Sequence, residues 1–363
     1  MTKVNSGFAG KDFLEKLLKT PSPSGYEDKV RLLWHDEMKN YAEEVRIDVH
    51  GNVIAAVNKD NSPRIMLAGH MDELGFQVKY IDDKGFIYFN RLGGFDIGII
   101  PGRKVRIHTK KGDVLGVMGK KAVHMMEREE REKVPKSHQL FIDVGAADKK
   151  EAESLVEIGD PITYDPNFEE LRNGVATSRG FDDKIGAFVV AQVLKNVAKR
   201  KNECKAGVFS VATVQEEVGL RGAKTSAHGI GPDIGIAVDV TNASDTPEIN
   251  LAQFGEVKLG KGAAISRGPN INPMVFEMLT KIAKEKKINH QIEAAPYPTG
   301  TDANVIQITR AGVAAGLVSV PCRYMHTYTE VISLKDVEDV ISLLTEFCLA
   351  VDNEIDFRPL KSY

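Results

Sequence analysis

The chain has 363 residues and a formal net charge of -3, with 42% hydrophobic and 27% charged residues. These proportions are those of an ordinary globular protein, and the length predicts two domains or one large domain with an insert. The small net charge gives no electrostatic reason to expect nucleic acid or an anionic membrane as a partner. Three widely spaced cysteines, no apolar signal segment and no apolar run of the ~18 residues that a membrane span needs predict a cytoplasmic protein.

The first part of the chain alternates helical and extended patterns. Apolar side chains recur at helical spacing twice, and prolines and a glycine separate the two runs. A polar–apolar alternation then runs on either side of His50-Gly51-Asn52, which is typical of a β-hairpin turn. We expect helices at residues 11–19 and 27–42, and strands at 45–49, 53–57 and 65–67.

The pattern changes after residue 73. Residues 78–91 and 104–118 alternate around glycine-containing turns, and helical patterns are scarce. We therefore expect residues 74–164 to form a small β-rich domain, barrel-like or PDZ-like, inserted into a mixed-sheet α/β domain made of residues 1–73 and 165–363. The charged segment 124–138 within the insert is expected to be a solvated, mobile loop.

Helices and strands alternate again in the last part of the chain. Apolar runs of strand length are followed by longer segments with helical periodicity, which is the pattern of an α/β sheet. We expect helices at 182–199, 273–287 and 334–351, and strands at 208–214, 234–238, 255–265 and 313–320.

Side chains that can bind metals follow four of these predicted strands. In open α/β sheets, ligands bind at the edge where the carboxyl ends of the strands lie. Acidic and imidazole groups gathered at one edge would suffer repulsion or desolvation without a cation. The residues are His70, Glu216, Glu217, Asp239 and His326.

Each of these groups also has an ordinary structural explanation when it is taken alone. A histidine can be a satisfied core residue, and a glutamate pair can be a solvated turn. Asp182 or Asp183 can be the N-cap of the helix that follows. Their collection at one sheet edge favours a metal site over several separate structural roles.

The number of candidate ligands matches a site for two metal ions. Two ions that share one bridging carboxylate need about five protein ligands, and histidine with carboxylate suits Zn²⁺, Co²⁺ or Mn²⁺. Such a pair activates a water between the ions and polarises a substrate carbonyl. Glu216 is the candidate general base, and Asp72 can hold the ring of His70 in the required tautomer. The five ligands would be His70, Asp182, Glu217, Asp239 and His326.

Two other functions fit parts of the same pattern. A glycoside hydrolase would use Glu216 and Glu217 as its acid pair, but it needs carboxyl groups roughly 5–10 Å apart across a sugar and leaves both histidines unused. A non-catalytic assembly protein with bound metal is the second alternative. Glu216, placed beside a ligand as a base would be, argues against it.

Seven short motifs occur in order along nearly the whole chain. They are Pro21-Ser22-Pro23-Ser24-Gly25-Tyr26-Glu27, Gly69-His70-Met71-Asp72-Glu73, Asp182-Asp183-Lys184-Ile185-Gly186, Gln215-Glu216-Glu217-Val218-Gly219, Asp239-Val240-Thr241, Gly300-Thr301-Asp302-Ala303 and Pro321-Cys322-Arg323-Tyr324-Met325-His326. In these motifs the sequence resembles the di-metal aminopeptidases of the glutamyl and deblocking aminopeptidase family, the tetrahedral TET peptidases.

The resemblance implies a role for each site residue. Glu216 matches the general base of the family, and Asp72 matches the carboxylate that orients His70. A cis peptide bond is implied between Asp182 and Asp183. The implied ligands are His70, Asp182 and Asp239 for one metal ion and Asp182, Glu217 and His326 for the other, with Asp182 shared.

The resemblance also implies an activity and an assembly. The activity is metal-dependent removal of N-terminal residues from peptides with a free N-terminus. Residues 74–164 would be a dimerisation domain in a homo-oligomer, a tetrahedral particle of twelve subunits built from dimers, in which the 124–138 loop becomes ordered. Two positions depart from the usual family pattern: Thr327-Tyr328 replaces Ser-Pro, and Phe95 replaces Trp. Neither change removes an implied ligand.

Overall fold

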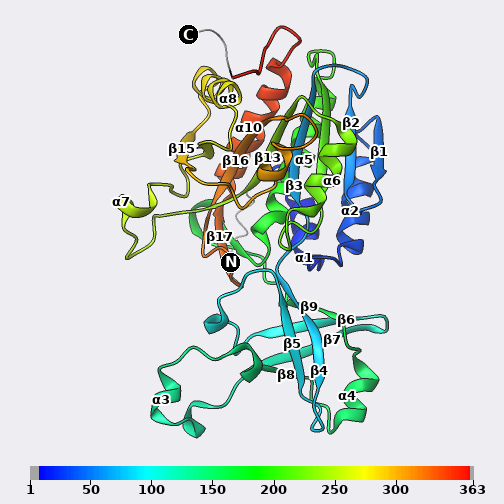
Figure 1. The fold of residues 1–363 in the computed structure, drawn as a ribbon, viewed down its shortest axis with the longest axis vertical. Helices are drawn as coiled ribbons and strands as arrows, with labels where there is room; N and C mark the ends of the chain where they lie inside the picture. The colour runs from blue at the N-terminus through cyan, green and yellow to red at the C-terminus, as the bar shows by residue number, and fades with distance from the viewer. Residues whose placement is uncertain (1–7, 360–363) are drawn as a thin grey trace.

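A computed structural model describes residues 8–359. It contains an 11-stranded mixed sheet with helices on both faces and a closed barrel of six strands, which lies at one end of the molecule (Figure 1). The expected mixed α/β class with a small β-rich part is confirmed. In the described part of the chain, no helix combines the length and the apolar character needed to cross a bilayer.

The four central strands of the sheet are parallel, and most of the outer strands pair antiparallel. Strands β12, β3, β13 and β16 run parallel to one another, whereas β1, β2 and β17 pair antiparallel to their neighbours. Strand β14 (Ala263–Arg267) pairs with β16 and with the edge strand β15 (His290–Ala294). The main path is β1 (Glu44–Ile47), β2 (Val53–Val57), β12 (Gly207–Thr213), β3 (Arg64–His70), β13 (Ile234–Asn242), β16 (Ala314–Arg323), β17 (Glu330–Ser333), β11 (Val175–Ser178) and β10 (Glu169–Glu170).

Helices cover both faces because side chains of a strand alternate between them. In β3, Ile65 and Leu67 join the apolar cluster of one face, and Met66 and Ala68 join that of the other. The first cluster contains side chains of α1 (Lys11–Lys19), α2 (Asp28–Met38), α5 (Phe181–Lys199), α8 (Pro273–Glu285) and α10 (Leu334–Ala350), and the second those of α6 (Arg221–Ile230) and α9 (Ala303–Ile306).

Helix α5 is packed tightly against β3. A Cβ atom on Gly69 would come within 2.3 Å of the backbone of Gly186, so only glycine permits this approach. One residue further along the helix, the carbonyl of Ala187 accepts a hydrogen bond from the indole N–H of Trp34 at 2.9 Å. The close contact fixes the start of α5 beside the end of β3.

Two of the sequence-based predictions were wrong in their boundaries. The strand expected at 255–265 begins only at Ala263, because Gly255, Gly260 and Gly262 adopt positive φ angles that an extended strand does not have. The helix expected to begin at Asp182 has non-helical backbone at that residue and at Asp183. Regular helix follows these two residues.

Two central strands are longer than expected. Strand β13 continues to Asn242 and β16 to Arg323, and they pair in parallel as far as Asn242 and Cys322. Asp239, expected just beyond a strand, therefore lies within β13, opposite Ser319. Pairing with a neighbour extended the strands past the apolar run visible in the sequence.

The barrel has an apolar core of its own. Phe76 is fully buried in it, stacks on Phe95 with 4.6 Å between ring centroids and meets Tyr164 edge-on. The phenylalanine that departs from the usual family pattern is thus part of this core. The strands are β4 (Gly75–Ile81), β5 (Ile87–Leu92), β6 (Lys104–Thr109), β7 (Gly112–Gly119), β8 (Phe141–Asp143) and β9 (Pro161–Tyr164).

Three short helices of the described chain lie outside the main layers of the fold, two of them in the barrel segment. Helix α4 (Lys149–Leu155) was missed in the sequence, because its roughly two turns show little apolar periodicity. The charged segment 124–138 contains α3 (Arg128–Arg131) and is mostly exposed. A further short helix, α7 (Leu251–Phe254), projects from the sheet side of the molecule (Figure 1).

That residues 74–164 form a domain of their own stays a prediction, and matched variants test it. Phe76→Ala empties a site in the barrel core, and Phe347→Ala empties one in the core beside the sheet. Each should lower the free energy of unfolding of its own part by about 3–5 kcal/mol. We expect two calorimetric transitions, with each variant shifting a different one. A single transition that both variants shift alike would show that barrel and sheet unfold together.

Candidate metal centre

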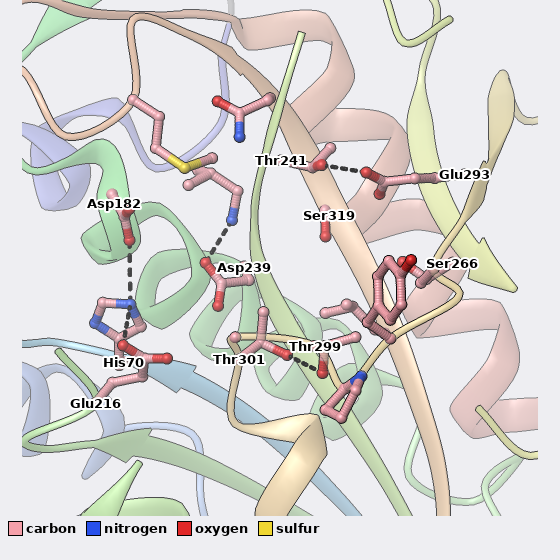
Figure 2. Close-up of a pocket in the computed structure, with 18 of the residues that line it drawn as sticks. His70, Asp182, Glu216, Asp239, Thr241, Ser266, Glu293, Thr299, Thr301 and Ser319 are labelled. Atoms are coloured by element: carbon pink, nitrogen blue, oxygen red, sulfur yellow. Dashed lines mark hydrogen bonds and ion pairs between the residues drawn. The ribbon is translucent and has the colours of Figure 1, made fainter. Parts of the chain in front are cut away.

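The candidate site lies where two central strands separate. Strands β3 and β13 pair only as far as Ala68 and Ala237, although β3 stays with β12 and β13 stays with β16 beyond that point. A cavity of about 420 Å³ opens at this end of the sheet (Figure 2). Its lining includes the predicted residues other than Asp72: His70, Asp182, Glu216, Glu217, Asp239 and His326.

Asp182 lies between two histidines. Its Oδ1 atom is 3.2 Å from Nε2 of His70, and its Oδ2 atom is 3.1 Å from Nε2 of His326. Figure 2 shows the first of these contacts. Burial opposes ionisation of Asp182, but the two imidazoles hold its pKa below the usual range. Both oxygens of this one carboxylate thus face other potential ligands, as a bridging group requires.

Asp183 joins the cluster through a different set of contacts. Its peptide bond with Asp182 is cis, as expected, and the side chain is fully buried. Its two oxygens accept hydrogen bonds from the N–H groups of His70 at 3.1 Å and Gly186 at 2.9 Å. Sequence reasoning offered Asp183 only as a possible N-cap, since the backbone that turns it inward is not visible in the sequence.

Two sets of side chains could each hold one metal ion. Within each set, one ligand atom per residue lies within 4.8 Å of the others. His70 belongs to both sets, and His326 to neither, although it contacts Asp182. The sets are His70, Asp182 and Glu217, and His70, Asp183 and Asp239.

The electrostatics of the cluster fit a bound cation. Burial raises the pKa of Glu216 to about 9 and that of Asp239 to about 8, and neighbouring carboxylates add to both shifts. Burial and the charge of Asp182 also raise the pKa of Glu217. Among the described residues, Oε1 of Glu216 and of Glu217 is buried without a hydrogen-bond partner. A divalent ion would neutralise this charge and give such oxygens a partner.

Asp72 does not line the cavity but positions residues that do. Its carboxylate accepts hydrogen bonds from the backbone N–H groups of Glu216 at 3.0 Å and Glu217 at 3.3 Å, and from the hydroxyl of Ser24 at 2.5 Å. Nδ1 of His70 is closer to the backbone carbonyl oxygen of Asp72, at 3.0 Å, than to its carboxylate, at 3.4 Å. Asp72 therefore contacts both the histidine and the turn that carries the two glutamates.

Two further glutamates hold the site backbone, and sequence reasoning gave neither a role. Glu27 is buried and accepts a hydrogen bond from the N–H of Gln215, whose φ of 56° is unusual for a residue other than glycine. Glu330 accepts from the N–H of His326 at 3.0 Å and from that of Asp182 at 3.1 Å. The signal that could have pointed to Glu27 is its position in the first of the sequence motifs. For Glu330, the available signal was its position four residues after the predicted ligand His326.

A buried ion cluster lies next to Asp72 in sequence. Glu73 pairs with Arg179 and with Lys184, whose Nζ is 2.8 Å away, and the three side chains are almost completely buried. Burial opposes the charge of Glu73, but the two cations hold its pKa at about 2. The cluster ties the end of β3 to the start of α5. His70 and Asp182 lie on these two segments.

Comparisons with known proteins agree with this geometry. The family model of the M42 glutamyl aminopeptidases matches residues 51–343. A lysyl aminopeptidase of Pyrococcus furiosus is 37% identical over 354 residues, covering 96% of this chain and 99% of its own. The solved TET aminopeptidase of the marine sediment archaeon Thaumarchaeota archaeon SCGC AB-539-E09 is 36% identical with a TM-score of 0.91, covering 95% and 97% of the two chains.

A second solved structure adds information on assembly. The TET1 peptidase of Pyrococcus horikoshii, which can assemble into a tetrahedron or a large octahedral shell, is 30% identical with a TM-score of 0.84. The match covers 94% of this chain and 99% of that one. The family expected from the sequence motifs is confirmed. The chain belongs to the M42 glutamyl aminopeptidase family and is an aminopeptidase, a hydrolase that acts on peptides.

Proposed function

We propose that this protein is a metal-dependent aminopeptidase that removes the N-terminal residue from peptides with a free N-terminus. The observation that carries the proposal is the position of Asp182, whose two oxygens face His70 and His326 in a cavity lined by further carboxylates. A glycosidase acid pair would leave both histidines without a role. A purely structural metal site would not account for the open cavity beside the ligands.

The chain's own residues would hold two divalent ions, with Zn²⁺ or Co²⁺ preferred and Mn²⁺ as an alternative, because the donors are imidazole and carboxylate groups. Divalent ions in such a site act as Lewis acids that make water more acidic and a carbonyl carbon more electrophilic. The proposed ligands are His70, Asp182, Glu217, Asp239 and His326, and the position of Asp183 beside Asp239 makes it a further candidate.

Glu216 is the proposed general base. It lines the cavity, and its Oε2 atom is 3.9 Å from Nε2 of His70. Its other oxygen, Oε1, has no hydrogen-bond partner among the described residues. Bound cations would oppose the rise in the pKa of Glu216, so that its ionised carboxylate could accept a proton from water. The same carboxyl group can then return the proton to the leaving amine. Asp72 fixes the backbone of Glu216 and so its approach to the cavity.

The proposed location is the cytoplasm, and the proposed assembly is a tetrahedral particle of twelve chains built from dimers. The three cysteines are free and buried, which supports a reducing compartment. The tetrahedral and octahedral shells of the Pyrococcus horikoshii relative support the assembly. Exposed apolar side chains on and beside the 124–138 segment, Val123, Met125 and Val134, support a subunit contact there.

The variant Glu216→Gln tests the general base. Because the amide keeps the shape of the side chain but cannot take a proton, we expect kcat on aminoacyl-p-nitroanilides to fall by about 10²- to 10⁴-fold. Metal content, measured by mass spectrometry of the purified protein, should stay the same. The control is Glu277→Gln, an exposed substitution on α8. Near-normal turnover by the Glu216 variant would refute the assignment.

Metal binding should release protons. Because the pKa of Asp239 is raised to about 8, its carboxyl group is mostly protonated at pH 7 before an ion binds, and the pKa of Glu217 is raised in the same direction. A cation binds the deprotonated forms, so its apparent affinity should decrease as the pH falls. Calorimetric titration of the chelator-treated protein, in buffers of different ionisation enthalpy, measures the released protons. Binding without proton release would contradict these carboxylates as ligands, and activity that survives the chelator would contradict metal dependence.

The assembly is tested by light scattering after size-exclusion chromatography. We expect a particle mass of about twelve times the 39.9 kDa of the chain. The substitution Met125→Asp places a charge in the proposed contact and should reduce the particle to a smaller species. A wild-type protein that stays monomeric at micromolar concentration would contradict the proposal.

A further inference from the structure

The cavity extends beyond the metal ligands to a second acidic group. Its far wall is formed by neighbouring strands of the sheet, and Figure 2 shows Glu293 across the cavity from His70, Asp182 and Glu216. The carboxylate of Glu293 points to the hydroxyl of Thr241, which donates a hydrogen bond at 2.6 Å. The side chains of this wall are Thr241 on β13, Ser266 on β14, Glu293 on β15 and Ser319 on β16.

The carboxyl group of Glu293 has no cationic partner among the described residues. In the described part of the chain it forms no ion pair, and burial raises its pKa. None of the described residues that line the cavity is Lys or Arg, and both lining histidines lie at the metal ligands. An isolated carboxylate in a partly dehydrated cavity is costly unless a ligand supplies the opposite charge.

We propose that Glu293 recognises the side chain of the substrate's N-terminal residue and selects a cationic one, lysine or arginine. The inference rests on the proposed function, in which the metal ligands and Glu216 hold the reacting end of the peptide. The N-terminal side chain then occupies the remaining part of the cavity. Leu317 offers apolar surface to its methylene groups, and the carboxylate of Glu293 binds its terminal charge.

Other classes of N-terminal side chain fit this wall less well. An acidic side chain would bring a second negative charge towards Glu293 and the cluster of carboxylates around Asp182. An apolar side chain would displace water from Glu293 without replacing its hydrogen bonds. A cationic side chain does neither, so the wall favours the cationic class.

The test compares substrates that differ only in the terminal charge. Lysyl- and norleucyl-p-nitroanilide share the same four-carbon stem, but norleucine lacks the ammonium group. We expect kcat/KM to be higher for the lysyl substrate. Glu293→Gln should lower the lysyl-to-norleucyl ratio by about 10- to 100-fold, since a hydrogen bond to a charged group is lost while the shape is kept. The control Glu277→Gln should leave the ratio unchanged.

A role of Glu293 in structure alone would lower both rates by the same factor, and that result would overturn the inference. So would a wild-type preference for norleucine. A second readout does not depend on turnover: calorimetric titration of the metal-loaded protein with L-lysine and with L-norleucine. L-lysine should bind more tightly to the wild type, and the difference should vanish in Glu293→Gln. If L-lysine binds more tightly in this way while no aminoacyl substrate is cleaved, the proposed function fails and the inference stands. Equal binding of both amino acids by the wild type overturns the inference.

Discussion

The repulsion between buried carboxylates at one edge of the sheet is the constraint on which the rest of the site depends. Burial and like charge both oppose ionisation of Glu217 and Asp239, so the folded chain brings together groups that do not all ionise unless a cation is bound. Backbone hydrogen bonds position the two glutamates: the carboxylate of Asp72 accepts hydrogen bonds from the N–H groups of Glu216 and Glu217. A divalent cation would relieve this constraint, because its charge favours the ionised carboxylates and displaces their protons.

The same strand contributes to the candidate metal centre and to the opposite wall of the cavity. Asp239 and Thr241 are two residues apart in β13, so their side chains leave the strand on the same side. One belongs to the candidate metal centre, and the other holds the carboxylate of Glu293. The proposed chemistry and the proposed selectivity would thus share a rigid element, and the spacing between them is set by the rise of a β-strand rather than by a loop.

Much of the fold and part of the site could be predicted from the sequence because their signals are local. His70 and the Glu216–Glu217 pair directly follow apolar runs, and such runs mark the strand ends. The inward turn of Asp183 could not be predicted, since it depends on non-helical backbone at a helix start. Nor could the position of Glu293, which depends on the pairing of edge strand β15 with β14, a contact between segments distant in sequence.

The ion cluster of Glu73, Arg179 and Lys184 has a consequence for how such proteins diversify. Glu73 follows β3, where the chain leaves the sheet, and it pairs with Arg179, which follows β11 after the chain has returned to the sheet. These ion pairs join the two ends of the intervening segment, so His70 and Asp182 are held near each other by contacts that do not pass through the barrel. The loop at Gly93 and Gly94 approaches Glu217 and His326, so it is the changes in the barrel away from this loop that leave the candidate site in place.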